Sequence, residues 1–262
     1  MEYESLQRRV ERERKAHDVD DVLAKNQNIK ARFSHYDSMP YLARRDTYVE
    51  RVIAKFKGHR VLDYGCGKGE NAVRFLRSGA FVFGIDISAN YVKSATGLAR
   101  RAGFAEDRNF KFQVMDAHSL AFDNDFFDFV MGNAILHHLD LKIAIREIKR
   151  VLKRHGRAIF EEPLGHNPLL RLYRWMTPNA RTADEKPLLN DDLNWISSIF
   201  ATKVQFYGLL SLPTALFTSV CLGPFPNNPL LTMADRIENS LNKVPVLRKF
   251  NQVVLIDMEK VI

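Results

Sequence analysis

Three glycines follow a short apolar stretch in a pattern that suits nucleotide binding. Residues 60–64 read as a strand, and a helical pattern begins near residue 71. Between them lie Gly65, Gly67 and Gly69. Glycines at a strand-to-helix turn let the backbone approach a ligand closely. A dinucleotide turn would need a glycine at position 70, where the chain has Glu70. The carboxylate of Asp63, two residues before the first glycine, favours a cationic ligand.

Two further carboxylates follow the next two predicted strands. Asp86 ends the apolar run 81–86, and Asp116 comes two residues after the run 110–114. A carboxylate at the end of a parallel strand can accept two hydrogen bonds from ribose hydroxyls.

These motifs, taken in order, resemble the class I S-adenosylmethionine (SAM)-dependent methyltransferases. The resemblance covers about residues 60–162 and includes the segment 131–139 after the fourth strand and the helix around 146–153. It implies that the glycine turn lies against the amino-acid part of SAM, that Asp86 holds the ribose and that Asp116 lies near the adenine amino group. The implied cofactor-binding residues are Asp63, Gly65, Cys66, Gly67, Gly69, Asp86, Ile87, Asp116, Ala117 and Asn133.

Candidate catalytic residues follow the fourth and fifth strands. SAM carries an activated methyl group, so a general base is needed only if the acceptor must lose a proton. His137 and His138 lie on a loop expected to face the acceptor, where a neutral imidazole could accept that proton. Alternatively, one ring orders the loop and the other is solvated. Glu162 could hold a cationic or hydroxyl group of the acceptor, or pair with Arg171 or Arg174.

Other side chains are candidates for binding the acceptor. An N-terminal helical segment covers the SAM site in related small-molecule methyltransferases, so His17 or Tyr36 could close the pocket; a solvated surface helix is the alternative. The full set of acceptor-binding candidates is His17, Tyr36, His166, Asn167 and Arg171.

The sequence predicts no metal site. His137 and His138 are adjacent, so their side chains are expected to point in different directions on a helix or a strand. Cys66 lies inside the glycine turn, without a partner cysteine motif.

Alternating strand and helix patterns predict an α/β fold. We expect a doubly wound, mostly parallel seven-stranded sheet with helices on both faces. The predicted organisation is an N-terminal helical arm over residues 1–56 and a SAM-binding domain over residues 57–262. Two insertions near the acceptor site are expected at about 163–190 and 208–248.

The second insertion contains an uncharged segment, residues 204–234, broken by prolines. No unbroken apolar stretch of the ~20 residues that span a bilayer occurs there. The two insertions could form a lid over an apolar acceptor, thicken the core or bury a dimer face, or touch a membrane surface.

Composition bounds the remaining alternatives. The chain has 262 residues, 46% of them hydrophobic, two cysteines and a net charge of +8. This composition is typical of a folded protein of the reducing cytoplasm, with peripheral membrane contact as an alternative. Residues 132–135 read Gly-Asn-Ala-Ile, which disfavours the enzymes that flip an amino base and carry Asn/Asp-Pro-Pro-aromatic there.

The prediction is a monomeric or homodimeric methyltransferase with SAM as its cofactor. It would act on O, N or C of a small, partly apolar metabolite. An RNA or protein methyltransferase and a non-catalytic SAM-binding protein are the alternatives.

Overall fold

A seven-stranded sheet runs through the molecule in the order β3-β2-β1-β4-β5-β7-β6. The computed structural model describes residues 2–18, 39–176, 184–221 and 228–261. The first five strands of this order pair in parallel, and β7 pairs antiparallel with both β5 and β6. The strands are β1 (Arg60–Tyr64), β2 (Phe81–Asp86), β3 (Phe110–Val114), β4 (Phe127–Asn133), β5 (Leu152–Pro163), β6 (Ala201–Tyr207) and β7 (Val253–Glu259). The predicted fold class is confirmed.

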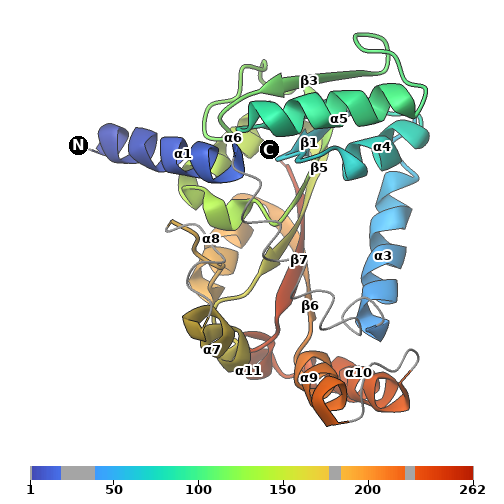
Figure 1. The fold of residues 1–262 in the computed structure, drawn as a ribbon, viewed down its shortest axis with the longest axis vertical. Helices are drawn as coiled ribbons and strands as arrows, with labels where there is room; N and C mark the ends of the chain where they lie inside the picture. The colour runs from blue at the N-terminus through green and yellow to red at the C-terminus, as the bar shows by residue number, and fades with distance from the viewer. Residues whose placement is uncertain (1, 19–38, 177–183, 222–227, 262) are drawn as a thin grey trace.

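Helices pack on both faces of the sheet (Figure 1). They are α1 (Glu2–Asp18), α3 (Pro40–Ile53), α4 (Glu70–Arg77), α5 (Ala89–Arg101), the 3-10 helix η2 (Leu136–His138), α6 (Leu141–Val151), α7 (Pro168–Met176), α8 (Asn190–Ile199), α9 (Ser211–Cys221), α10 (Pro229–Leu241) and α11 (Pro245–Arg248). One core cluster unites α3, α4 and α5 with the sheet, and a second unites α6 and α8 with it. Side-chain caps at Ser88 and Asp140 begin α5 and α6, as such residues commonly do.

The strands expected at 60–64, 81–86 and 110–114 have the observed bounds, because each is a short apolar run that ends in a turn. β5 is the longest strand, since it begins at Leu152 and pairs with both β4 and β7. The helix that the resemblance places around 146–153 is α6, which stops at Val151, just before β5 begins. Residues 211–221, for which no helix was predicted, form α9.

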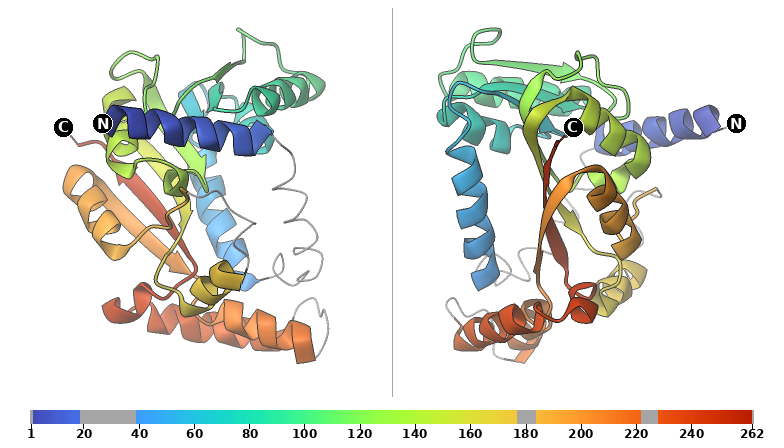
Figure 2. Two further views of the ribbon diagram at one scale, coloured as in Figure 1. Left: turned by 60° about the vertical axis from the view of Figure 1, so that its left-hand side comes forward. Right: turned by 180° about the vertical axis from the view of Figure 1, so that it is seen from behind.

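The N-terminal region contributes two separate elements. α3 places Val52 and Ile53 in a core cluster, whereas α1 lies across the loop that follows β4 (Figure 2). The division into an arm and a domain stays a prediction. Among the described residues, no helix is both long and apolar enough to cross a membrane.

Candidate functional site

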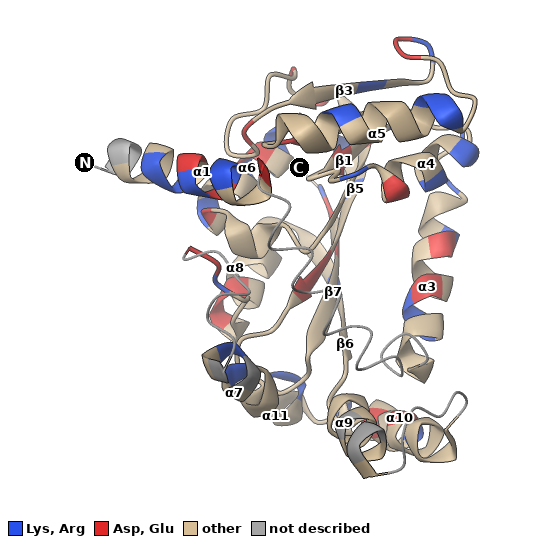
Figure 3. Ribbon diagram, in the orientation of Figure 1, with Lys and Arg blue, Asp and Glu red and all other residues tan. Residues whose placement is uncertain are grey.

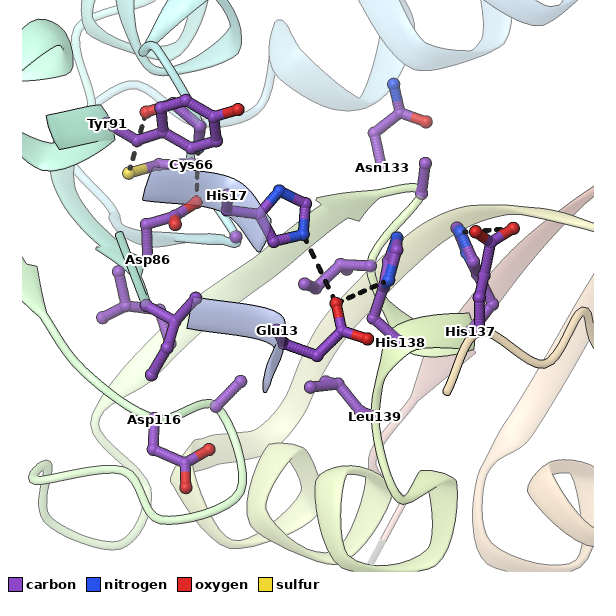
Figure 4. Close-up of a pocket in the computed structure, with 18 of the residues that line it drawn as sticks. Glu13, His17, Cys66, Asp86, Tyr91, Asp116, Asn133, His137, His138 and Leu139 are labelled. Atoms are coloured by element: carbon purple, nitrogen blue, oxygen red, sulfur yellow. Dashed lines mark hydrogen bonds and ion pairs between the residues drawn. The ribbon is translucent and has the colours of Figure 1, made fainter. Parts of the chain in front are cut away.

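A cavity of about 680 Å³ opens where the strands β1, β2 and β4 reach their carboxyl ends. Its walls come from the glycine turn, from the ends of β2 and β4, from α1 and from the loop before α8 (Figure 4). The volume lies in the range of pockets that bind small molecules and cofactors. In an open α/β sheet this edge is where ligands bind, because the helices and loops diverge there.

The glycine turn is held by the neighbouring strand. The backbone N–H groups of Gly65 and Cys66 donate to the carbonyl of Ile85, at 3.0 and 2.8 Å. Gly67 has a φ of +50°, and a Cβ added there would meet nothing within 4 Å. This open space adjoins the cavity, so the backbone of Gly67 is free for a ligand to approach.

The third glycine has a different role. Gly69 does not line the cavity; its φ is +90°, and a Cβ added there would lie 2.7 Å from the Cα of Ala95. Gly69 therefore lets α4 and α5 pack closely. The expectation that it contacts the cofactor directly does not match this geometry.

Asp86 connects the turn to the end of β2. Its carboxylate accepts from the backbone N–H of Gly67 and of Ser88, both at 2.9 Å. Burial raises the pKa of Asp86, although these two hydrogen bonds act to lower it. The side chain lines the cavity together with Ile87, as expected for a group that holds a ribose.

Asp63 lies behind the turn, in a smaller cavity of about 80 Å³. Asn71 and Asn133 line both cavities, so the two adjoin. The Oδ2 atom of Asp63 is buried and has no hydrogen-bond partner within the described chain. Burial, with a further contribution from Asp86, raises the pKa of Asp63 to about 7. A cationic ligand group would supply the missing partner.

Asp116 is held by a histidine that the sequence analysis did not single out. Burial acts to raise the pKa of Asp116, but hydrogen bonds from the ring and the backbone of His118 outweigh it, and the net pKa is lowered. The Nε2 atom of His118 accepts from the backbone N–H of Asp140 at 2.8 Å. Its Nδ1 therefore carries the proton that is donated to Asp116. Asp116, Ala117 and His118 all line the cavity.

His137 and Glu162 form a buried pair. The Glu162 carboxylate accepts from the backbone N–H groups of Ile135 and Leu136, at 2.9 and 2.8 Å, and lies 2.6 Å from Nδ1 of His137. Glu162 does not line the cavity, and it pairs with neither Arg171 nor Arg174. The prediction that Glu162 contacts the acceptor is therefore replaced by a positioning role: it holds η2 and orients the His137 ring.

His138 faces α1 instead. Its Nδ1 lies 3.1 Å from Oε2 of Glu13, and the Nε2 of His17 lies 3.5 Å from the same oxygen. The hydrogen bond that the His17 ring donates to the Glu13 carboxylate raises the pKa of His17, against the effect of burial. Arg9 donates to the carbonyls of His138 and Leu139, both at 3.1 Å. These contacts hold α1 across the cavity, and His17 lines that cavity (Figure 4); its closure of the pocket over a ligand stays a prediction.

The geometric reason given against a metal site was wrong. On η2 the His137 and His138 rings lie with their centroids 4.2 Å apart and do not diverge. Two groups of potential ligand atoms lie within 4.8 Å of one another, and both include His138: Glu13 with His17 and His138, and His137 with His138 and Glu185. In the second group, the Glu185 carboxylate forms an ion pair with Arg174, whose Nη1 lies 2.7 Å from Oε1 of Glu185.

Three predicted acceptor-binding residues lie away from the cavity. Asn167 is buried and caps α7, where its Oδ1 accepts from the backbone N–H of Leu169 at 3.0 Å. His166 and Arg171 line neither cavity. Tyr36 lies outside the described residues.

Several residues that the sequence analysis missed do line the cavity: Arg9, Glu13, Lys68, Tyr91, His118, Arg174 and Glu185. One signal was available, because Glu13 and His17 are spaced i, i+4 and share one face of a helix. The position of Glu185 was not visible, since it depends on how residues 184–188 pack against η2.

The first insertion reaches the cavity and the second does not. Leu170, Arg174 and Pro187 line it, but none of the described residues from 208 to 248 does. Only the first insertion therefore lies where a lid could form among the described residues, and its role as a lid stays a prediction.

Comparison with known proteins agrees with this geometry. Residues 62–160 match the methyltransferase domain family. An uncharacterized methyltransferase, YcgJ, of Bacillus subtilis is 38% identical over 100 residues, which cover 38% of each protein. The 27-O-demethylrifamycin SV methyltransferase of Amycolatopsis mediterranei is 38% identical over 102 residues, 38% of this chain and 37% of that protein. The matched segment thus spans less than two fifths of either relative.

The fold extends beyond the matched segment. A SAM-dependent methyltransferase from Archaeoglobus fulgidus superimposes with a TM-score of 0.56 at 21% identity, covering 82% of this chain and 92% of the other. The match over residues 62–160, together with the strand order, supports a class I, SAM-dependent methyltransferase.

Proposed function

We propose that the protein transfers a methyl group from SAM to an O, N or C atom of a small, partly apolar molecule. One observation carries the proposal: a single cavity joins the glycine turn and Asp86 to His137, whose ring is oriented by a buried carboxylate. A cofactor site and a candidate base therefore face the same space.

The residues around the glycine turn fit SAM. The Asp86 carboxylate would accept from the ribose hydroxyls, and the space beside Gly67 admits a ligand against the backbone. The buried Oδ2 of Asp63 supports the binding of a cationic group such as an ammonium. Ile87, Met115 and Ala117 supply apolar walls beside Asp116. When bound, SAM supplies a methyl group already activated on a positively charged sulfur.

The chain's own part in the reaction would be to position the acceptor and take up its proton. The Glu162 carboxylate lies 2.6 Å from Nδ1 of His137, and it would accept the proton on that nitrogen. This tautomer leaves the lone pair on Nε2, and the His137 ring lines the cavity. Nε2 is the atom that we assign to receive a proton from an acceptor hydroxyl or amine.

The wall beside His137 indicates the acceptor's character. Leu139, Leu164 and Leu170 are apolar, whereas Arg174 and Glu185 form an ion pair at 2.7 Å. Such a surface suits a molecule with an apolar body and a polar end. The rifamycin methyltransferase named above acts on a small molecule, which supports a small acceptor here.

The test combines binding and transfer. Calorimetric titration with SAM should show saturable binding, and incubation with methyl-labelled SAM and a metabolite extract should yield one labelled small molecule. Labelled RNA or protein in its place would contradict the acceptor class. Failure to bind SAM would overturn the proposal as a whole.

A further inference from the structure

Exposed apolar side chains gather at one end of the molecule. Helices α7, α9, α10 and α11 lie together there, far from β3 and α5 (Figures 1 and 2). Of the eleven large hydrophobic side chains that are exposed in the described chain, eight lie on these helices or on the link between α10 and α11. A concentration of this kind marks an interaction surface, because scattered single exposures are the norm.

On two of the helices the exposed residues form stripes. Leu230, Met233 and Ile237 share one face of α10 at i, i+3 and i+7. Leu231 and Ala234, on the adjoining face of the helix, are buried against the protein. α10 thus buries one apolar face against the protein and exposes a second apolar face to solvent.

α7 and α9 add the bulkiest groups. Trp175 is 79% exposed, and Leu172, three residues earlier on α7, is 52% exposed. Phe217 on α9 is 59% exposed. Tryptophan is enriched at the boundary between water and lipid, where its ring sits among the headgroups.

The exposed charge on these helices is of one sign. Their only acidic residues, Asp235 and Glu238 on α10, are both buried. Asp235 pairs with Arg44, and Glu238 accepts from backbone N–H groups at the start of α9, including that of Ser211. Figure 3 shows the other charges of this end as basic positions on α7 and beside α11.

The basic side chains border the apolar stripes. Arg171, Arg236 and Lys243 are exposed, and Arg248 and Lys249 are half-buried beside them. We propose that this end, defined by α7 and α9–α11, docks on the surface of an anionic lipid bilayer. Apolar side chains inserted below the headgroups, with cations at their level, are the arrangement found in helices that lie on membranes.

Charge also argues against a second copy of this chain as the occupant. A symmetric dimer through this end would bring the same cations face to face. An anionic surface instead neutralises them. α7 lines the cavity through Leu170 and Arg174, so docking would hold the cavity one helix away from the lipid.

Vesicle co-sedimentation tests the proposal with the full chain. We expect binding to vesicles of phosphatidylcholine mixed with phosphatidylglycerol, and little binding to phosphatidylcholine alone. Arg171→Glu, and separately Lys243→Glu, should each lower the partition coefficient by about fivefold or more, because each cation near an anionic surface contributes at that level. Arg101→Glu, an exposed position on α5, is the matched control and should bind like the unaltered chain.

The apolar stripe is tested separately. Met233→Glu should weaken binding to the mixed vesicles, whereas Val114→Glu, equally exposed but on β3, should not. In a Trp195→Phe background, the emission of Trp175 should shift to the blue when the mixed vesicles are added. Circular dichroism of every variant checks that it is folded.

Three outcomes would overturn the proposal. One is that the unaltered chain does not bind the mixed vesicles, or that Met233→Glu binds them as tightly as the unaltered chain. Another is that light scattering shows a dimer that Met233→Glu dissociates, since the end defined by α7 and α9–α11 would then be a contact between two copies of the chain. The third is binding to soluble polyglutamate but not to vesicles, which would identify an acidic protein as the partner.

Discussion

The Nδ1 atom of His137 lies 2.6 Å from Oε2 of Glu162, a side chain with no exposed surface. The same carboxylate accepts from the backbone N–H groups of Ile135 and Leu136, so one buried charge fixes both the loop and the ring. The two residues are 25 positions apart and belong to η2 and β5. Their contact joins two separate candidates into one unit, and in the proposed reaction the ring is the base and the carboxylate its support.

Glu162→Gln tests this unit. A glutamine amide can turn its NH2 group toward Nδ1, which would favour the tautomer with the proton on Nε2 and abolish the base. We expect kcat to fall by about 10²- to 10⁴-fold, the usual contribution of a general base. The Kd for SAM should stay nearly constant. His137→Gln should give a similar loss of kcat.

Unchanged kcat in both variants would show that the acceptor needs no deprotonation by the protein. Loss of SAM binding in Glu162→Gln would instead mean that the carboxylate holds the loop alone. Thermal unfolding of both variants separates these results from simple loss of folding.

Asp86→Asn addresses the cofactor site. Replacing a carboxylate that accepts hydrogen bonds by a neutral amide should weaken SAM binding by about 10- to 100-fold, the value of a hydrogen bond to a charged group. Isothermal titration measures the change. Asp123→Asn, at an exposed position, is the control and should leave the affinity unaltered. If the two variants bound SAM with equal affinity, Asp86 would not be part of the SAM-binding site.

Asp63 should make stability depend on pH. Its pKa is raised to about 7 in the folded chain, whereas an unfolded Asp titrates near about 4. The native state therefore holds an extra proton between these values, and stability falls as the pH rises from about 4 to about 7. Asp63→Asn should remove this loss, so it should gain roughly 3–4 kcal/mol over the unaltered chain at pH 8 and little near pH 4.

Urea denaturation at several pH values measures that difference. The comparison of variant with parent isolates Asp63 from the other titrating carboxylates. A constant difference across the range would show that the carboxyl group does not hold a proton near neutrality.

Substitution by alanine at Gly69 and at Gly67 should affect mainly stability at the first position and mainly SAM affinity at the second. Gly69→Ala combines a left-handed φ with a Cβ 2.7 Å from the backbone of Ala95, so it should cost about 2–4 kcal/mol of unfolding free energy. Gly67→Ala meets no protein atom and should cost about 1–2 kcal/mol from its φ alone. The new methyl group of Gly67→Ala borders the cavity, so that variant should show the larger loss of SAM affinity. Chemical denaturation of both variants measures the loss of stability, and titration with SAM measures the loss of affinity.

The contact of α1 with the cavity loop should weaken at alkaline pH. The hydrogen bond with Glu13 raises the pKa of His17, so the docked helix favours the protonated ring. Docking is therefore strongest below the ordinary pKa of histidine and is lost as the pH rises through the raised value. Hydrogen exchange of residues 5–17, corrected for the intrinsic effect of pH, should show lower protection at high pH. His17→Asn should abolish this pH dependence of protection. The protection of α8, measured in the same sample, serves as the reference.

Much of the cofactor site was visible in the sequence because its residues are local. The bounds of β1, β2 and β3 follow from short apolar runs, and a parallel sheet brings their carboxyl ends to one edge. Asp86 and the glycine turn therefore appeared where they were expected. The turn geometry also explains Gly69, although its role is the packing of α4 on α5.

The contacts that cross the molecule were not predictable in the same way. The pairing of Glu162 with His137 and that of Glu13 with His138 depend on where β5, η2 and α1 pack. Ion pairs and hydrogen bonds of this kind act over a few ångströms, and a sequence pattern carries no information about such distances between distant elements. For the same reason Asn167 was taken for an acceptor ligand, although it caps α7.

By itself the sequence determined the class I fold and the cofactor motifs, because apolar periodicity and glycine turns are local properties that dictate strands, helices and their edges. Only the tertiary structure decided which histidine is backed by a carboxylate, which insertion reaches the cavity and which helices expose their apolar faces. Those outcomes depend on how separate elements pack, and packing is settled by the whole chain at once.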